Sequence, residues 1–153
     1  MAYGRCGALI GEIIAAMIGT VAFSVLFGVP SRYYSYCGLI GGAGWAVFAG
    51  AQGVCGEATA CMLATMVVIL LSRFTAIWKH CPVTVFLISG IFPLVPGAGV
   101  YWTAYYIVTD QLALALHTGY QAVKDAVAIV LGIVFIFEIP QKVFLRILGR
   151  KKM

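Results

Sequence analysis

Charged residues are scarce in this chain. They make up 10% of its 153 residues, whereas hydrophobic residues make up 63%. An ordinary soluble domain has about 25% charged and about 45–50% apolar residues. Because small soluble domains leave a large share of their surface in water, a soluble chain of this length could not bury so many apolar side chains. The composition excludes a soluble globular domain and predicts an all-α, polytopic membrane protein in contact with the lipid bilayer.

Motifs for catalysis and for metal or nucleotide binding are also missing. There is no Gly-x-x-x-x-Gly-Lys-Ser/Thr sequence for ATP, and neither a Ser/His/Asp arrangement nor a His-Glu-x-x-His sequence for hydrolysis. The five cysteines include no Cys-x-x-Cys pair, which argues against a disulfide framework and a zinc site. His80 and Cys81 are adjacent but too few to hold a metal. We therefore expect no enzyme, no cofactor and no metal site.

The ten Lys and Arg residues exceed the five Asp and Glu residues, but they do not form a nucleic-acid-binding face. They lie at the ends of apolar runs, where basic residues set the orientation of membrane helices. A phosphate-binding surface would instead gather them on one face. We expect no nucleic-acid partner.

At about 20 apolar residues per crossing, the chain has room for about five spans in one membrane domain, 1–153. The apolar runs predict five spans and a basic interfacial tail, at about 7–28, 37–52, 54–72, 83–108 (broken) and 118–139, with the tail at 140–153. Gly53 is the expected boundary between the second and third spans. A single span over 37–72 would hold 36 residues, beyond the usual length of about 17–25. Fusing these two spans gives the four-span alternative.

Five spans place the two termini on opposite sides of the membrane. The positive-inside rule favours a cytoplasmic C-terminus, because Arg32, Arg73, Lys79 and the basic tail then lie inside and Arg5 lies outside. In this interpretation Arg73 is an inner anchor, with an anion contact at the inner mouth as the alternative. The N-terminus is then expected outside.

Small residues recur every four positions in the first two spans: Gly7, Gly11, Ala15 and Gly19, then Gly38, Gly42, Ala46 and Gly50. Such stripes let helix backbones approach closely in lipid. The two helices are expected to pack on each other or against another protein. The second possibility makes the chain a subunit of a larger assembly or of a homo-oligomer.

The fourth span carries Pro93 and Pro96 within an apolar segment. Proline has no N–H, so a regular helix would leave the carbonyls of Ser89 and Phe92 unpaired. Lipid cannot satisfy such groups, and broken backbone at membrane depth is tolerated against protein or a wet cavity. The sequence predicts a break that lines a cavity, with a simple proline kink as the alternative.

A helix that restarts near Pro96 would leave the amides of Gly97, Ala98 and Gly99 unpaired at its N-terminus. The positive end of the helix dipole makes this a position for a carboxylate. Carbonyls released over residues 89–92 would suit an ammonium group or a cation. Discontinuous helices of secondary transporters bind substrates in this way.

The segment Pro-Val-Thr-Val-Phe at 82–86, with Gly-Ile-Phe-Pro-Leu-Val-Pro-Gly at 90–97 and then Tyr101, resembles the threonine/serine exporter family. The resemblance covers about residues 38–139 of this chain and is closest to the family's short split-subunit branch, which corresponds to its C-terminal half. It implies a bacterial plasma (inner) membrane protein that works with a larger membrane subunit. It also implies export of threonine and serine, or of a dicarboxylate such as succinate.

The break and the motif together define a candidate substrate-binding site for a small carboxylate: Ser89, Gly90, Phe92, Pro93, Pro96, Gly97, Ala98, Gly99 and Tyr101. Glu57 is the ion-coupling candidate, because an ionisable residue in a membrane segment is costly unless it has a function. Its alternative is a hydrated position in the headgroup region. Asp125 is interpreted as an interfacial pair with Lys124.

We therefore predict a small subunit of a secondary transporter that exports a carboxylate-bearing metabolite. The alternative is a membrane subunit that does not transport and only assembles or stabilises a partner. Transport that depends on the broken span would separate the two.

Overall fold

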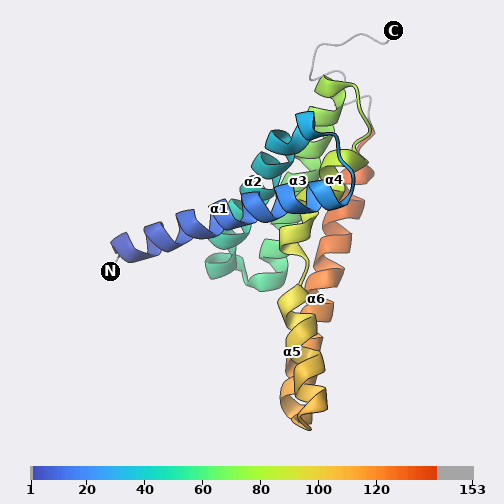
Figure 1. Ribbon diagram of the computed structural model, residues 1–153. Helices are drawn as coiled ribbons and strands as arrows, with labels where there is room; N and C mark the ends of the chain where they lie inside the picture. The colour runs from blue at the N-terminus through green and yellow to red at the C-terminus, as the bar shows by residue number, and fades with distance from the viewer. Residues whose placement is uncertain (1, 141–153) are drawn as a thin grey trace.

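The structure is a computed structural model that describes residues 2–140, with side chains described from residue 9 (Figure 1). The described chain contains helices and no strand. Its elements are, in order, α1 (Ala2–Leu26), the 3-10 helix η1 (Ser31–Tyr33), α2 (Tyr34–Cys55), α3 (Glu57–Lys79), α4 (Thr84–Ile91), the 3-10 helix η2 (Phe92–Leu94), α5 (Gly97–Val108) and α6 (Leu112–Phe137). Of the predicted interfacial tail, residues 141–153 lie outside the described residues.

Four helices are long and apolar enough to cross a membrane: α1, η1 with α2, α3 and α6. The segments Thr84–Leu94 and Gly97–Val108 make up a fifth, broken span, whose two parts are bent by 48°. These helices confirm the predicted all-α membrane bundle of about five spans, with the fourth broken at Pro93 and Pro96. The chain is a multi-pass membrane protein.

The second and third spans are separate helices, but they divide at Gly56 and not at Gly53. Gly56 has φ 82° and ψ 164°, a conformation that residues with a Cβ avoid. One glycine therefore makes the whole turn between α2 and α3. The last helix begins at Leu112, six residues before the predicted span at about 118–139, and the turn before it closes at Asp110, whose φ is 57°.

The core lies around α3, which packs against α2, α4 and α6. Its fully or almost fully buried apolar side chains include Cys37, Ile40, Ala64, Val68, Phe86 and Ile129. Leu94 of η2 is also buried there. The first part of the broken span is thus held inside the bundle.

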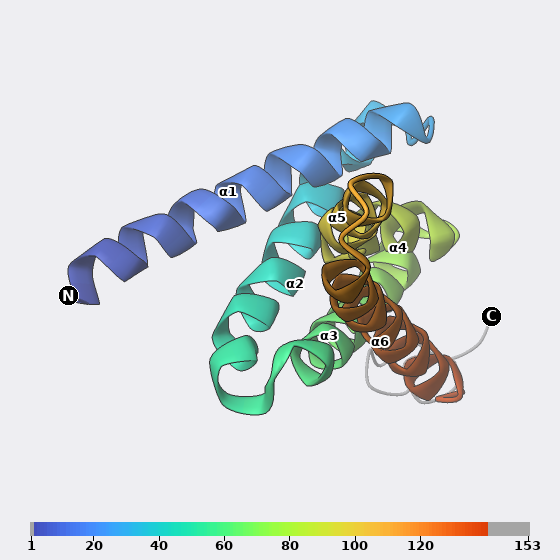
Figure 2. The same ribbon diagram turned by 90° about the horizontal axis from the view of Figure 1, so that it is seen from below.

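Helix α1 crosses α2, and its N-terminal part extends away from the other helices (Figures 1 and 2). The glycines of α2 make this crossing close, since a Cβ on Gly38 would lie 3.0 Å from Val21. The glycine stripe of α1 is not used in the same way, because Gly11 and Gly19 have open space around their Cβ positions. Only one of the two predicted stripes therefore packs against a described residue.

Helices α5 and α6 form an antiparallel hairpin that extends beyond the α2–α3 turn (Figure 1). Small residues allow the close approach: a Cβ on Gly99 would lie 3.1 Å from the Ala122 Cβ. The Thr103 hydroxyl also lies 3.1 Å from the Thr118 hydroxyl, within hydrogen-bonding distance. No residue of α5 is buried.

Arg73 connects α3 to the far end of α6. Its guanidinium donates hydrogen bonds of 2.7 Å and 2.8 Å to the carbonyls of Ile136 and Ile139. These carbonyls lie at the negative end of the α6 dipole, where a cation is favourable. Arg73 thereby fixes the position of the helix that carries Asp125.

Candidate functional site

The break between η2 and α5 is a local turn with its own hydrogen bonds. Pro96 has φ −74° and ψ 54°, the geometry of an inverse γ-turn, in which the Gly97 N–H donates to the Val95 carbonyl at 2.7 Å. The Phe92 carbonyl accepts the Val95 N–H at 3.2 Å. The expectations that the Gly97 amide and the Phe92 carbonyl are unpaired were wrong, because the chain closes tight turns before and after Val95.

The next two amides behave as predicted. No backbone carbonyl among residues 2–140 accepts the N–H of Ala98 or Gly99. Both lie in the first turn of α5, which has twelve residues. Two backbone donors and the positive end of a helix dipole therefore remain available for an anion.

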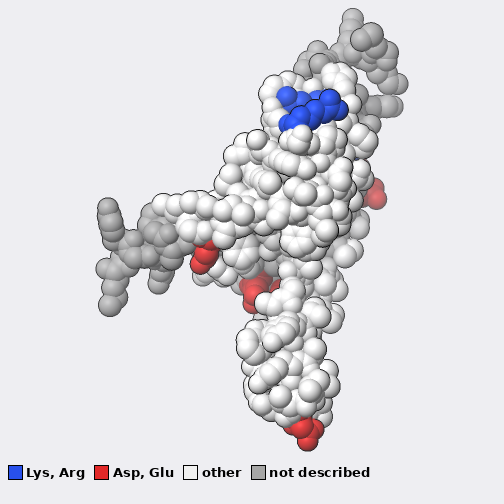
Figure 3. Space-filling model, in the orientation of Figure 1, with Lys and Arg blue, Asp and Glu red and all other residues white. Residues whose placement is uncertain are grey.

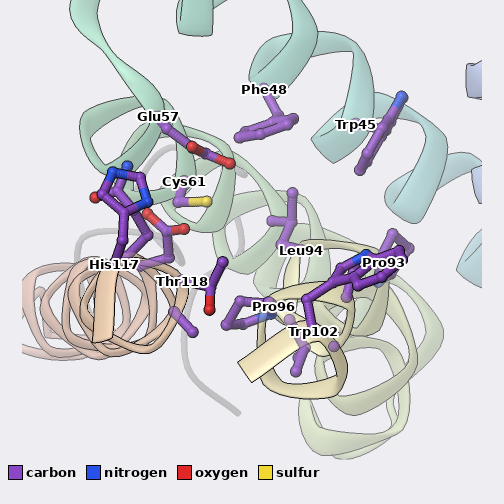
Figure 4. A pocket seen from close by; sticks show the side chains of 17 residues that line it. Trp45, Phe48, Glu57, Cys61, Pro93, Leu94, Pro96, Trp102, His117 and Thr118 are labelled. Atoms are coloured by element: carbon purple, nitrogen blue, oxygen red, sulfur yellow. The ribbon is translucent and has the colours of Figure 1, made fainter. Parts of the chain in front are cut away.

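A cavity of about 440 Å³ lies beside this break (Figure 4). Its volume falls within the range of about 300–1,000 Å³ found for small-molecule sites. Residues from α2, α3, the break with α5, and α6 line it: Trp45, Phe48, Glu57, Cys61, Pro93 to Gly99, Trp102, His117, Thr118, Gln121, Ala122 and Asp125. Pro93, Pro96, Gly97, Ala98, Gly99 and Glu57 from the predicted set are thus brought together.

Four other residues of the predicted set do not line this cavity. Gly90 is buried, and a Cβ there would lie 2.9 Å from Ile40. Phe92 stacks on Phe23 of α1, with 3.5 Å between the ring centroids. Tyr101 is 63% exposed.

Ser89, the fourth, is fully buried and lines a separate cavity of about 200 Å³. That cavity lies between α4 and the chain that follows α1, at residues 27–30. Ser89 and the break therefore border different hollows of the molecule.

Glu57 begins α3, and its carboxylate points into the cavity (Figure 4). An acidic residue in the first turn also stabilises the helix through the dipole. Cys61 lies one turn further along α3 and lines the same cavity. Thr65, the next residue on this face, is fully buried beside Gly132 of α6.

Asp125 of α6 lines the cavity, although its position beside Lys124 suggested an interfacial pair. It is 6% exposed, and its Oδ1 atom has no hydrogen-bond partner among the described residues. Lys124 is exposed, so the two charges lie on different faces of α6 and the expected interfacial pair was wrong. The spacing of Asp125 from Ala122 and Gly132 places it on the buried face of α6, a helical pattern visible in the sequence.

The cavity has two carboxylates and one histidine, His117, but no lysine or arginine among its described lining residues. Glu57 and Asp125 supply the negative charge, while the amides of Ala98 and Gly99 supply donors for an anion. Aromatic rings of Trp45, Phe48 and Trp102 form the apolar walls. The arrangement suits a small molecule that carries both an anionic and a cationic group.

Glu12 of α1 does not line the cavity. Its Oε2 atom accepts a 3.4 Å hydrogen bond from the indole N–H of Trp45. Glu12 is exposed, whereas the Trp45 side chain also reaches the cavity. This contact positions one of the aromatic walls.

Comparison with known proteins gives one family. The family model described as "Threonine/Serine exporter, ThrE" matches residues 12–139. The matched range includes every residue that lines the cavity beside the break. No solved structure matches this chain.

Proposed function

The chain belongs to the threonine/serine exporter family, and from this premise we propose that it is the small subunit of a secondary transporter. In this proposal it exports small carboxylate-bearing metabolites together with a larger membrane subunit. The observation that carries the proposal is the broken span, which opens onto a cavity of about 440 Å³ at a helix N-terminus. A simple proline kink would not need such a cavity.

The substrate carboxylate binds at the start of α5. The amides of Ala98 and Gly99 donate to it, and Pro93, Pro96 and Gly97 shape the adjoining wall. Ser89, Gly90 and Phe92 support the break from the packed side, and Tyr101 follows it on α5. Alternating access then requires the two parts of the broken span to change their relative position.

Glu57 is the proposed ion-coupling residue. Its carboxylate lines the cavity from the first turn of α3, where it can exchange a proton with water. Protonation would remove one negative charge from a cavity without lysine or arginine among its described lining residues. Substrate binding and proton binding would therefore influence each other.

The distribution of charge supports an inner-membrane protein with its N-terminus outside and its C-terminus in the cytoplasm. Basic side chains gather at the end formed by η1 and the last turn of α3, whereas acidic ones are spread over α1, the α2–α3 turn, the hairpin tip and the C-terminal end of α6 (Figure 3). Lys79 Nζ lies 4.5 Å from the ring centroids of both Tyr36 and Trp78. Such a group of aromatic and basic residues is typical of a cytoplasmic membrane boundary.

The open glycine stripe of α1 favours a second candidate function. Gly11 and Gly19 meet no described atom at their Cβ positions, so another chain could approach this face closely. A larger subunit or a second copy of this chain would fit such a face. The chain would then be an assembly subunit that does not bind the substrate.

Efflux from proteoliposomes separates the two functions. The vesicles would contain this chain, the larger subunit, or both, and would be loaded with labelled threonine, serine or succinate. Gly97→Leu places a side chain at the cavity wall, and no atom lies within 4 Å of the position of its Cβ. We expect this variant and Pro96→Ala to assemble normally. Their efflux rate should be lower than that of the wild type by a factor of about ten or more, and a factor of ten corresponds to a free-energy difference of about 1.4 kcal/mol.

Val100→Leu is the matched control, since Val100 is exposed on α5 and does not line the cavity. It should leave efflux unchanged. Normal efflux with both Gly97→Leu and Pro96→Ala would contradict the transport site and support the assembly function.

A further inference from the structure

Asp125 has an environment that a structural carboxylate rarely has. It is 94% buried, one of its oxygens has no partner among the described residues, and it lines the cavity at the break. We infer that Asp125 binds the ammonium group of the transported molecule and makes the site selective for amino acids over acids without an ammonium group. The inference rests on the proposed transport function.

The charges around Asp125 leave a place for a cation. Glu57 and Cys61 face it from α3, and His117 and Gln121 lie with it along the cavity side of α6. The break and α5 contribute no ionisable side chain to the lining. Lys124, the neighbouring cation on α6, is exposed and does not line the cavity. Burying a carboxylate is costly unless a cation meets it there, and a ligand ammonium group would supply that charge inside the cavity.

The amides of Ala98 and Gly99 at the start of α5 lie beside the part of α6 that carries Asp125. Gly99 packs against Ala122, and Asp125 follows Ala122 by three residues, about 4.5 Å along the axis. An α-amino acid carries its carboxylate and its ammonium group on the same carbon atom. Its two charges can therefore meet the amides of Ala98 and Gly99 and the Asp125 carboxylate within one cavity.

A dicarboxylate would meet the opposite situation. With one carboxylate at the α5 N-terminus, its second carboxylate would face Asp125 and Glu57, and no lysine or arginine is among the described lining residues to offset them. Like charges at such short range repel each other strongly in a poorly solvated site. Asp125 thus decides between the two substrate classes that the sequence left open.

The test uses inside-out membrane vesicles from the source organism, so that natural partners are present. The native gene is replaced by Asp125→Asn, by Asp125→Glu, or by the control Lys124→Gln, which changes the exposed neighbour. Uptake of labelled threonine is measured in competition with unlabelled threonine, 3-hydroxybutyrate and succinate. The compound 3-hydroxybutyrate has the carbon skeleton and hydroxyl group of threonine but lacks its ammonium group.

We expect wild-type and Lys124→Gln vesicles to prefer threonine to both other acids by about tenfold or more. In Asp125→Asn the ratio of this preference should fall towards one, which means no preference. Asp125→Glu keeps the carboxylate and should retain most of the wild-type preference. A merely structural defect would lower the uptake of all substrates and leave the preference unchanged.

An unchanged preference in Asp125→Asn would overturn the inference while leaving the transport function intact. If Asp125→Asn does not accumulate in the membrane, Asp125→Ser provides the same comparison with a smaller neutral side chain. Wild-type vesicles that take up no more threonine than vesicles from a deletion strain would instead contradict the proposed function.

Discussion

The two parts of the broken span, α4 and α5, differ in what covers them. In α4, Phe86, Ser89 and Gly90 are buried among α1, α2 and α3. In α5 no residue is buried, and α6 is the main helix that it contacts. The cavity therefore has one wall anchored in the core and another held mainly by a single helix. A transporter needs such a contrast, because one part must stay in place while another moves.

Two glycines show the same contrast at the level of single residues. A Cβ on Gly90 would lie 2.9 Å from Ile40 and 3.2 Å from Val68, whereas a Cβ on Gly97 would meet nothing within 4 Å. Gly90 is required for close helix packing. Gly97 leaves space at the cavity. Glycine therefore has a packing role in α4, and in α5 its proposed role is to keep the cavity open to the substrate.

Truncating the anchored part should have the largest effect on stability. Phe86 is fully buried, so Phe86→Ala should lower the free energy of unfolding by about 3–5 kcal/mol. Val100→Ala on α5 removes a side chain that is 61% exposed and should have little effect. Denaturant titration in detergent micelles measures both, and equal losses would contradict the division into an anchored and an open part.

Adding one methyl group to each glycine gives a smaller and sharper comparison. Gly90→Ala should destabilise the protein by about 1–3 kcal/mol, because Ile40 and Val68 must move. Gly97→Ala should change stability by less than about 0.5 kcal/mol. Thermal unfolding of the two purified variants tests this difference. A lower melting temperature for Gly97→Ala than for Gly90→Ala would refute the assigned roles.

The sequence was sufficient for features that depend on local chemistry. Apolar runs of membrane length predicted the helices, and Pro93 and Pro96 predicted the break because proline cannot complete a helical hydrogen bond. The free amides of Ala98 and Gly99 followed from the same reasoning. These features need no knowledge of distant contacts.

Other features depended on torsion angles and on helix faces. The ψ angle of Pro96 decides that the Gly97 amide is paired, and composition does not specify that angle. Asp125 was assigned to its neighbour Lys124, although consecutive residues on a helix point in different directions. Gly90 and Phe92 were placed in the site by proximity in sequence, but both side-chain positions face other helices.

The most direct test of the central claim, that the cavity at the break holds the substrate, is protection of a single cysteine. Ala98→Cys and Val100→Cys would be made separately in a cysteine-free background that retains transport. Both positions are exposed on α5, but residue 98 lines the cavity and residue 100 does not. The rate of maleimide modification is then measured in native membrane vesicles with and without saturating threonine. We predict that threonine slows modification at position 98 several-fold and leaves the rate at position 100 unchanged, whereas equal rates with and without threonine at both positions would contradict the claim.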